Sequence, residues 1–180
     1  MKEFETQILN INPEEIANRL RELGAEEKPE DFQERFVFDI NYLDSQLGAD
    51  EWIRVRRVNN KSTLTYKKRT GTGISDTEEI ETKIKDFDNT ARILSKLKCF
   101  KGVYYQENKR KKFKLNNIKF TLDTWPLIPT FLEIESTSEK KVREGLKLLN
   151  LEGKDEGHIG TLQIYKKYGI DLHAHKELKF

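Results

Sequence analysis

The chain has 180 residues, hydrophobic and charged residues each make up 36%, and the formal net charge is only +2. This length suits one good-sized domain, and no stretch rich in Pro, Gly or Ser divides it, so we expect a single domain over residues 1–180. The balanced charge argues against a simple nucleic-acid binder, and the lone Cys99 excludes an internal disulfide framework.

The first half of the chain alternates strand patterns with two helical patterns. The opening EFETQ predicts a strand, followed by a helix that Asn12 caps, Pro13 begins and Gly24 ends. Antiparallel strands are predicted at RFVFDI, DEWIRVRRV, STLTYKKR and EEIETKI. A second helix is predicted within FDNTARILSKLKCF, with Asp88 as its cap and a stripe formed by Ile93, Leu94 and Leu97.

The second half repeats this scheme. Residues 103–114 and NIKFTLD predict a hairpin around the turn pair Asn116 and Asn117. LEIE predicts a strand, and TLQIYKKYG predicts a last helical piece. Between them a third helix is expected from about Ser138, with one apolar face formed by Val142, Leu146 and Leu149.

A strand with two glutamates precedes each of the three longer helices. Residues two apart in a strand point to the same face, so each pair places two carboxylates side by side. A single pair of this kind usually belongs to the solvated face of a half-buried sheet. Here the pattern recurs three times, as Glu3 and Glu5, Glu79 and Glu81, and Glu133 and Glu135.

The same alternation gives every predicted strand one aliphatic face and one charged face. Amphipathic helices need an apolar surface to cover, so the aliphatic faces should lie beneath them. The charged faces then belong either to a flat sheet exposed to water or to a barrel with its charge turned inward, and seven or eight strands suffice for closure. The charged faces include Arg54, Arg56, Lys67, Lys83, Arg110, Lys112 and Asp123.

The mixture of acids and bases indicates the kind of ligand that such a cavity would hold. Lys and Arg bind phosphate oxygens, whereas paired carboxylates hold hard cations such as Mg²⁺ or Mn²⁺. Burying this much charge without partners is very costly. A charged lumen therefore predicts a metal-bound polyphosphate.

Several short motifs occur in a fixed order over nearly the whole chain: EFETQ, WIRVR, LTYKK, EEIE, the KR pair at 109–110, LD and FLEIE. This ordered set resembles the CYTH domain of the triphosphate tunnel metalloenzymes. The stretches DTWPLIPTFLEIE and IYKKYGIDL are most similar to bacterial proteins grouped with class IV adenylyl cyclases. The resemblance implies an α+β fold, with a closed antiparallel eight-stranded β-barrel as the tunnel and helices packed outside. It also implies Mg²⁺ or Mn²⁺ as cofactor.

The resemblance implies a role for each charged residue. The metal ligands would be Glu3, Glu5, Glu133 and Glu135, with Glu79 and Glu81 orienting bases or water. A nucleoside triphosphate or tripolyphosphate would be bound by Arg54, Arg56, Lys67, Lys83, Arg110, Lys112 and Gln7. The residues implied in the chemistry are Glu5, Lys67, Arg110 and Asp123.

Three positions depart from the family pattern. Gln7 and Asn108 stand where many members have lysine, and Lys83 stands where an acidic or neutral residue is expected. Loss of one charge-assisted contact costs about 1.5–3 kcal/mol. Three functions are therefore considered: a class IV adenylyl cyclase, which the resemblance favours and which makes cyclic AMP and pyrophosphate from ATP; an inorganic or nucleoside triphosphatase; and a non-catalytic nucleotide or polyphosphate binder.

Partners and location follow from composition. No segment approaches 18 consecutive apolar residues, so we expect no membrane span and a cytoplasmic protein. In the KRKKFK run the positive residues alternate between the two faces of a strand, so no nucleic-acid partner is expected. A monomer and a homodimer are both compatible with the sequence.

Overall fold

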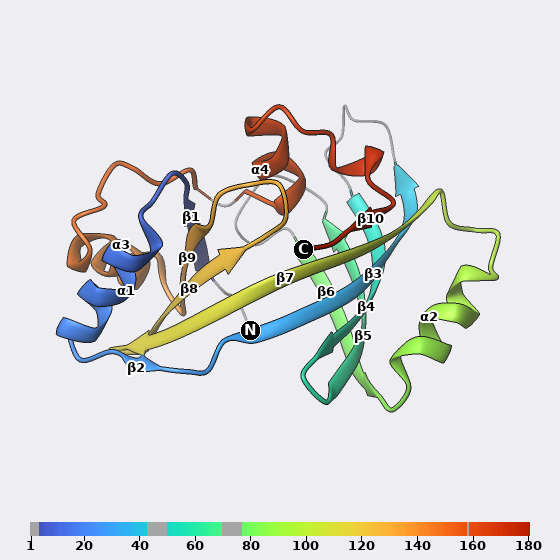
Figure 1. The fold of residues 1–180 in the computed structure, drawn as a ribbon, viewed down its shortest axis with the longest axis horizontal. Helices are drawn as coiled ribbons and strands as arrows, with labels where there is room; N and C mark the ends of the chain where they lie inside the picture. Colours follow the sequence, from blue (N-terminus) through green and yellow to red (C-terminus); the bar gives the residue numbers. More distant parts are fainter. Residues whose placement is uncertain (1–3, 43–49, 70–76, 158) are drawn as a thin grey trace. The chain divides into compact units, whose positions relative to one another are not determined.

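The computed structural model describes residues 4–42, 50–69, 77–157 and 159–180, which form two compact units. Unit 1 comprises Met1–Asp31 and Lys109–Leu172, and unit 2 comprises Phe32–Asn108 and His173–Phe180. The strands β3 (Asp31–Tyr42) and β7 (Gly102–Leu115) run from one unit into the other (Figure 1). Within the described ranges, no helix is long and apolar enough to cross a membrane.

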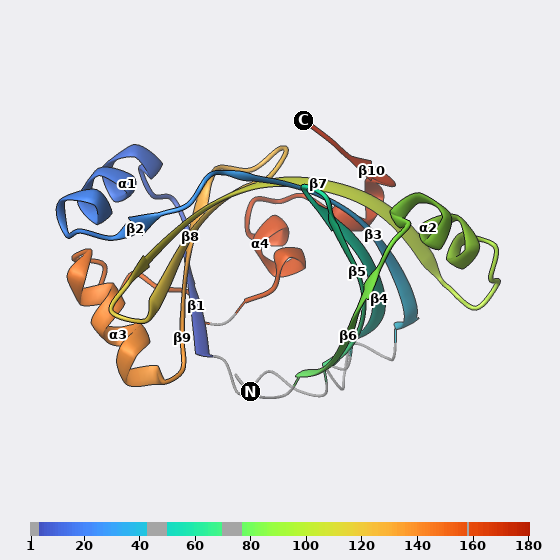
Figure 2. The same ribbon diagram turned by 90° about the horizontal axis from the view of Figure 1, so that it is seen from below.

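Unit 1 is an antiparallel sheet with strand order β1-β9-β8-β7 and helices on both sides. Its strands are β1 (Phe4–Ile8), β9 (Phe131–Ser136), β8 (Ile118–Thr124), the end of β7, and the short β2 (Glu26–Glu27), which pairs with β7. The helices α1 (Pro13–Glu22) and α3 (Glu139–Leu148) cover one side of β1, β8 and β9 (Figure 2). The helix α4 (Thr161–Lys167) lies on the other side of these strands.

The boundaries of these elements follow from local chemistry. The Asn12 side chain accepts from two backbone N–H groups of the first turn of α1, and the Ser138 hydroxyl accepts from the backbone N–H of Lys141 at the start of α3. Gly24 follows α1 with φ 77°, a conformation that glycine adopts without strain. Asn116 and Asn117 have φ 50° and 61°, as a type I′ hairpin turn requires.

The core of unit 1 lies between the aliphatic faces of the strands and the helices α1 and α3. Ile8 of β1, Phe120 of β8 and Ile134 of β9 are buried against Leu20 of α1 and Leu146 of α3. The predicted division of these strands into an aliphatic and a charged face is therefore confirmed. The charged faces of β1, β8 and β9 point away from α1 and α3.

Unit 2 is built on the strand order β7-β3-β4-β5-β6. It contains β4 (Asp50–Val58), β5 (Lys61–Arg69), β6 (Thr77–Ile84), the helix α2 (Phe87–Ser95), and the short β10 (Glu177–Leu178), which pairs with β7. A 3₁₀ turn, η1 (Leu172–Ala174), joins the two units near the C-terminus. The core packs Phe38 of β3 and Val55 of β4 against Phe87 and Ala91 of α2.

Two details of α2 differ from the prediction. Asp86, not Asp88, is the N-cap, and its side chain accepts from the backbone N–H of Asn89. The face of α2 that packs on the sheet carries Phe87 and Ala91, which are buried, and Leu94, which is partly buried. Ile93 and Leu97, predicted to be on that stripe, are 66% and 49% exposed.

The closed eight-stranded barrel is not observed. The strand order ends at β1 in unit 1 and at β6 in unit 2, and over the described residues no hydrogen-bond ladder closes the sheet. The outer edge of β1 instead forms backbone hydrogen bonds with residues 156–157. Gln7 N–H donates to the Gly157 carbonyl, and Glu156 N–H donates to the Gln7 carbonyl. Side-chain alternation specifies which face is charged, but whether two edges pair is decided by backbone register.

Candidate functional site

The charged face of unit 1 begins with a row of acidic and amide side chains on β1 and β9. In the antiparallel register Glu5 lies directly opposite Glu135, and Gln7 lies directly opposite Glu133. Like charges placed opposite each other on a sheet destabilise it. Lys119 compensates the charge of Glu135, and a bound cation would reduce the repulsion further.

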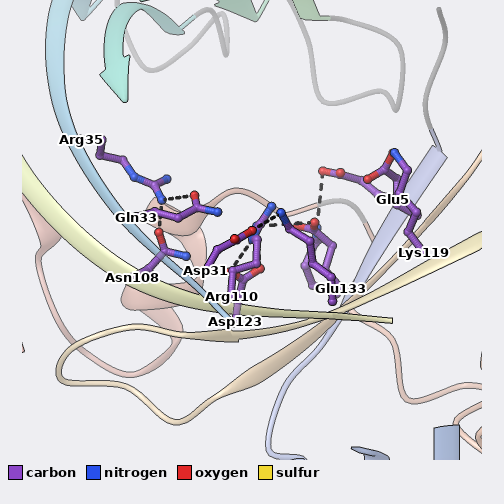
Figure 3. Close-up of polar contacts among 12 residues, drawn as sticks. Glu5, Asp31, Gln33, Arg35, Asn108, Arg110, Lys119, Asp123 and Glu133 are labelled. Carbon is purple, nitrogen blue, oxygen red and sulfur yellow. Dashed lines mark hydrogen bonds and ion pairs between the residues drawn. The ribbon is translucent and has the colours of Figure 1, made fainter. Parts of the chain in front are cut away.

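Arg110 of β7 is the centre of the same face (Figure 3). Its guanidinium forms two hydrogen bonds with Asp123 of β8, Nε to Oδ1 at 2.8 Å and Nη2 to Oδ2 at 2.6 Å. Glu133 Oε1 lies 3.6 Å from Arg110 Nη2. Burial alone would lower the pKa of Arg110, but the charges of Asp123 and Glu133 outweigh it and raise the pKa, so the guanidinium stays charged.

Glu133 lies in an environment that disfavours its charge. Burial is the main cause that raises the pKa of its carboxyl to about 7, and the negative charges of Asp123 and Glu5 raise it further. Arg110 and the hydrogen bond from Gln7 act in the opposite direction without cancelling these effects. The region around Glu133 therefore holds more negative than positive charge, which favours binding of a cation.

Gln7 is held in one orientation by its neighbours. It is 2% exposed, and its side-chain carbonyl accepts a hydrogen bond of 2.9 Å from the backbone N–H of Ile159. Its amide nitrogen consequently faces the carboxylates and donates to Glu5 at 3.5 Å and to Glu133 at 3.4 Å. A lysine has no acceptor and could not make the contact with Ile159.

Two further predicted residues of unit 1 form ion pairs. Glu135, predicted as a metal ligand, lies 2.5 Å from Lys119 Nζ of β8. Lys112, predicted to bind substrate, lies 2.5 Å from the carboxylate of Asp31. Both pairs compete with the roles predicted for these side chains.

In unit 2 the predicted cations and their carboxylates are brought together on β4, β5 and β6. Lys67 Nζ lies 2.6 Å from Glu79, and Arg56 lies 3.6 Å from Glu81. Arg54 lies between 3.7 and 3.9 Å from the same two glutamates. These contacts hold three cationic side chains on one face of the sheet. A group of cations like this can bind several phosphate oxygens at once.

The acidic strand β6 is more exposed than the cations that it supports. The side chains of Glu79 and Glu81 are 40% and 37% exposed, whereas that of Arg54 is 14% exposed. Lys83, predicted to bind substrate, is exposed and lies opposite Thr63 in the register. Ion pairs at such exposure contribute about 0–1 kcal/mol each, so the acids mainly orient the cations.

The predicted metal site is only partly within the described residues. Glu3 lies outside them. Across residues 4–42, 50–69, 77–157 and 159–180, no three His, Cys, Asp or Glu side chains are grouped as a metal centre requires. The metal assignment of Glu5, Glu133 and Glu135 stays a prediction.

The sequence reasoning missed Asp31 and Arg35, which both belong to β3. They share a face with Gln33, because residues two apart on a strand point the same way. The signal was present in DFQERFVFDI, where Phe36 and Phe38 mark the apolar face and place Arg35 on the opposite one.

Comparison with known proteins identifies the family and the fold. The model of the CYTH domain matches residues 1–159. The PH1012 protein from Pyrococcus horikoshii is 26% identical with a TM-score of 0.71, over 87% of this chain and 96% of that one. A candidate adenylate cyclase from Vibrio parahaemolyticus is 17% identical with a TM-score of 0.69, over 92% of this chain and 98% of that one.

A more distant structure has the same fold. A Hippeastrum protein with a dominant triphosphatase activity is 16% identical with a TM-score of 0.55, over 93% of this chain and 95% of that one. At these identities the Vibrio and Hippeastrum proteins show a common fold alone. No curated protein matches the chain significantly.

Proposed function

The chain belongs to the CYTH domain family, and on this premise we propose that it is a divalent-metal-dependent enzyme that acts on a nucleoside triphosphate. The leading reaction is that of a class IV adenylyl cyclase, which forms cyclic AMP and pyrophosphate from ATP. The observation that carries the proposal is the buried carboxylate of Glu133, beside Arg110 and close to the negative charges of Asp123 and Glu5. Arg110 supplies one positive charge against these three carboxylates, so a bound divalent cation would reduce the repulsion that remains.

The donor set of unit 1 fits a hard divalent cation. Mg²⁺ and Mn²⁺ prefer carboxylate oxygens, and Glu5 and Glu133 would hold the ion, with Glu3 and Glu135 as further ligands. Asp123 is committed to Arg110 through two hydrogen bonds, so its role is to orient that guanidinium. A bound ion would supply Lewis acidity and charge neutralisation at phosphate oxygens.

The cations of unit 2 would bind the phosphate chain. Arg54 and Arg56 offer planar donors that suit phosphate oxygens, and Lys67 adds a point charge. Glu79 and Glu81 keep these donors on one face before substrate arrives. Each charged face by itself therefore carries groups that suit part of a metal-bound triphosphate: carboxylates for the metal in unit 1 and cations for the phosphate oxygens in unit 2.

A second candidate is a triphosphatase that hydrolyses a nucleotide or tripolyphosphate. Both reactions need a divalent cation and cationic side chains at the phosphate oxygens, and the two charged faces offer groups of both kinds. A third candidate, a non-catalytic binder, is favoured by the neutral amides of Gln7 and Asn108 at positions where the family resemblance leads us to expect lysine.

Product analysis separates the three functions. The purified protein is incubated with ATP, GTP or tripolyphosphate and Mg²⁺ or Mn²⁺. Cyclic AMP with pyrophosphate indicates a cyclase, orthophosphate a triphosphatase, and tight binding without product a binder. Absence of triphosphate binding under all these conditions would overturn the proposal.

Two variants link the result to the site. Glu133→Gln should abolish metal-dependent triphosphate binding, because it removes the charge that favours the cation. Glu139→Gln, an exposed change on α3, should leave binding unchanged. Metal-dependent binding that survives in Glu133→Gln would remove this residue from the metal site.

A further inference from the structure

Two arginines lie opposite each other on the charged face of unit 2. In the register of β3 and β4, Arg35 is the direct partner of Arg56. Arg54, two residues from Arg56, points to the same face. Glu79 and Glu81 lie 3.6–3.9 Å from Arg54 and Arg56. Because directly opposed like charges destabilise a sheet, an anion bound by all three arginines would stabilise this face further.

Arg35 is oriented by two buried amides. Its Nη2 donates to Oδ1 of Asn108 on β7, and it lies 3.2 Å from Oε1 of Gln33 on β3 (Figure 3). Asn108 is 0% exposed and Gln33 is 2% exposed, so neither acceptor can move far. Amide oxygens orient a guanidinium through these contacts without cancelling its charge.

Arg57 of the same unit has a structural role and serves as a comparison for Arg35. It lies on the opposite face of β4, where its guanidinium forms two hydrogen bonds with Glu34 and one with Asp88. It also stacks over the ring of Phe87 at 4.4 Å. Arg57 is bound by carboxylates on that face, whereas Arg35 donates to the amides of Asn108 and Gln33 on the face that carries Arg54 and Arg56.

We propose that Arg35 is a phosphate-binding residue and that Asn108 and Gln33 are its positioning residues. Arg35 supplies from β3 the positive charge that is missing at position 108 of β7. This inference rests on the proposed function, because it assigns a further contact to the same triphosphate.

Tripolyphosphate binding, measured by isothermal titration calorimetry with Mg²⁺ present, tests the assignment. Arg35→Gln should weaken affinity about 10-fold or more, the loss of one charge-assisted contact. The dependence of Kd on salt should also become shallower, because one cation has left the site. Arg57→Gln is the matched control, and thermal melting first checks that this variant is folded. Its affinity for tripolyphosphate should stay within about twofold of that of the unmodified protein.

A rescue variant distinguishes binding from a structural effect. Asn108→Lys in the Arg35→Gln background returns a cation to the neighbouring strand and should recover most of the lost affinity. Arg35→Lys keeps the charge but loses the planar donors, and should weaken binding less than Arg35→Gln. If Arg35→Gln does not fold, Arg35→Lys and Asn108→Ala take its place, each expected to weaken binding about threefold or more.

The possible failures are distinguishable. No tripolyphosphate binding by the unmodified protein would overturn the proposed function. Loss of binding in Arg54→Gln, with unmodified affinity in Arg35→Gln or in both substitute variants, would overturn this inference alone.

Discussion

Arg110 and Asp123 form a two-point ion pair in which the carboxylate is completely buried and the guanidinium extends toward Glu133. The two residues are direct partners in the register of β7 and β8. The pair fixes one positive charge beside the carboxylates of β1 and β9. It therefore affects both the stability of unit 1 and the electrostatics of the candidate site.

Removal of the Asp123 carboxylate should be strongly destabilising. Asp123→Ala leaves the partly buried Arg110 charge without this partner, and the free energy of unfolding should fall by about 3–5 kcal/mol. Urea denaturation measures the change. Asp88→Ala, which removes an exposed partner of Arg57, should cost no more than about 1 kcal/mol. Equal effects of the two changes would contradict the importance of burial for this pair.

Glu133 should make the metal-free protein less stable as pH rises. Its pKa is raised from 4.5 to about 7 in the folded state, so the folded chain binds more protons than the unfolded chain between these values. The stability that it contributes is complete below about pH 4.5 and is lost as pH rises through 7. Urea denaturation in EDTA measures this change. Between pH 5 and 8, the free energy of unfolding of the unmodified protein should fall by about 1–3 kcal/mol more than that of Glu133→Gln.

The effect of added metal on stability is a second test of Glu133. Mn²⁺ added at pH 8 should restore stability to the unmodified protein and have little effect on Glu133→Gln, because the cation favours the ionised carboxylate. A pH dependence that is identical in the two proteins would show that Glu133 has an ordinary pKa.

Gln7→Lys tests the neutral residue in the first motif. The ammonium would lie beside Glu5 and Glu133 and add a phosphate contact, so turnover should rise if the site is a weakened catalyst. The Ile159 N–H would lose its acceptor, and the free energy of unfolding should fall by about 1–3 kcal/mol. Gln7→Met removes the acceptor without adding charge, so it should show the loss of stability without the gain in turnover.

Gly145 on α3 should tolerate no side chain. An added Cβ would lie 2.9 Å from Cγ2 of Ile134 and 3.2 Å from Cγ2 of Ile118. Overpacking of this kind costs about 1–3 kcal/mol and exceeds the helix propensity that alanine gains. Gly145→Ala should therefore lower the melting temperature, whereas Glu144→Ala on the exposed side of α3 should not.

Much of the fold could be predicted because the signals are local. The cap Asn12 and the turn pair Asn116–Asn117 act within a few residues of chain and behave as predicted, and α3 begins directly after Ser138, close to the predicted start. The predicted order of strand followed by helix is found at β1 and α1, β6 and α2, and β9 and α3, although Glu3 of the first carboxylate pair lies outside the described residues. At α2 the prediction named Asp88 as the cap and was wrong, because the cap is Asp86, two residues earlier in the chain.

The sequence predicted which residues carry the charged faces, but it did not predict which side chains contact these residues. Period-two alternation placed Glu133 and Arg110 on charged faces. It could not show that Lys112 meets Asp31, or that Arg35 meets Asn108, because these contacts join strands far apart in the chain. Both missed residues belong to β3, where the apolar residues Phe36 and Phe38 gave the needed parity.

The sequence by itself determined the type of each element, the face that each strand presents and, through an ordered set of motifs, the family. These properties depend on side chains that interact within one element. Only the tertiary structure decided that the sheet is not closed by hydrogen bonds over the described residues, that Glu133 is buried among other carboxylates, and that Gln7 is anchored by Ile159. The physical reason is that register, burial and charge compensation arise between segments distant in sequence, and strand alternation carries no information about which segments meet.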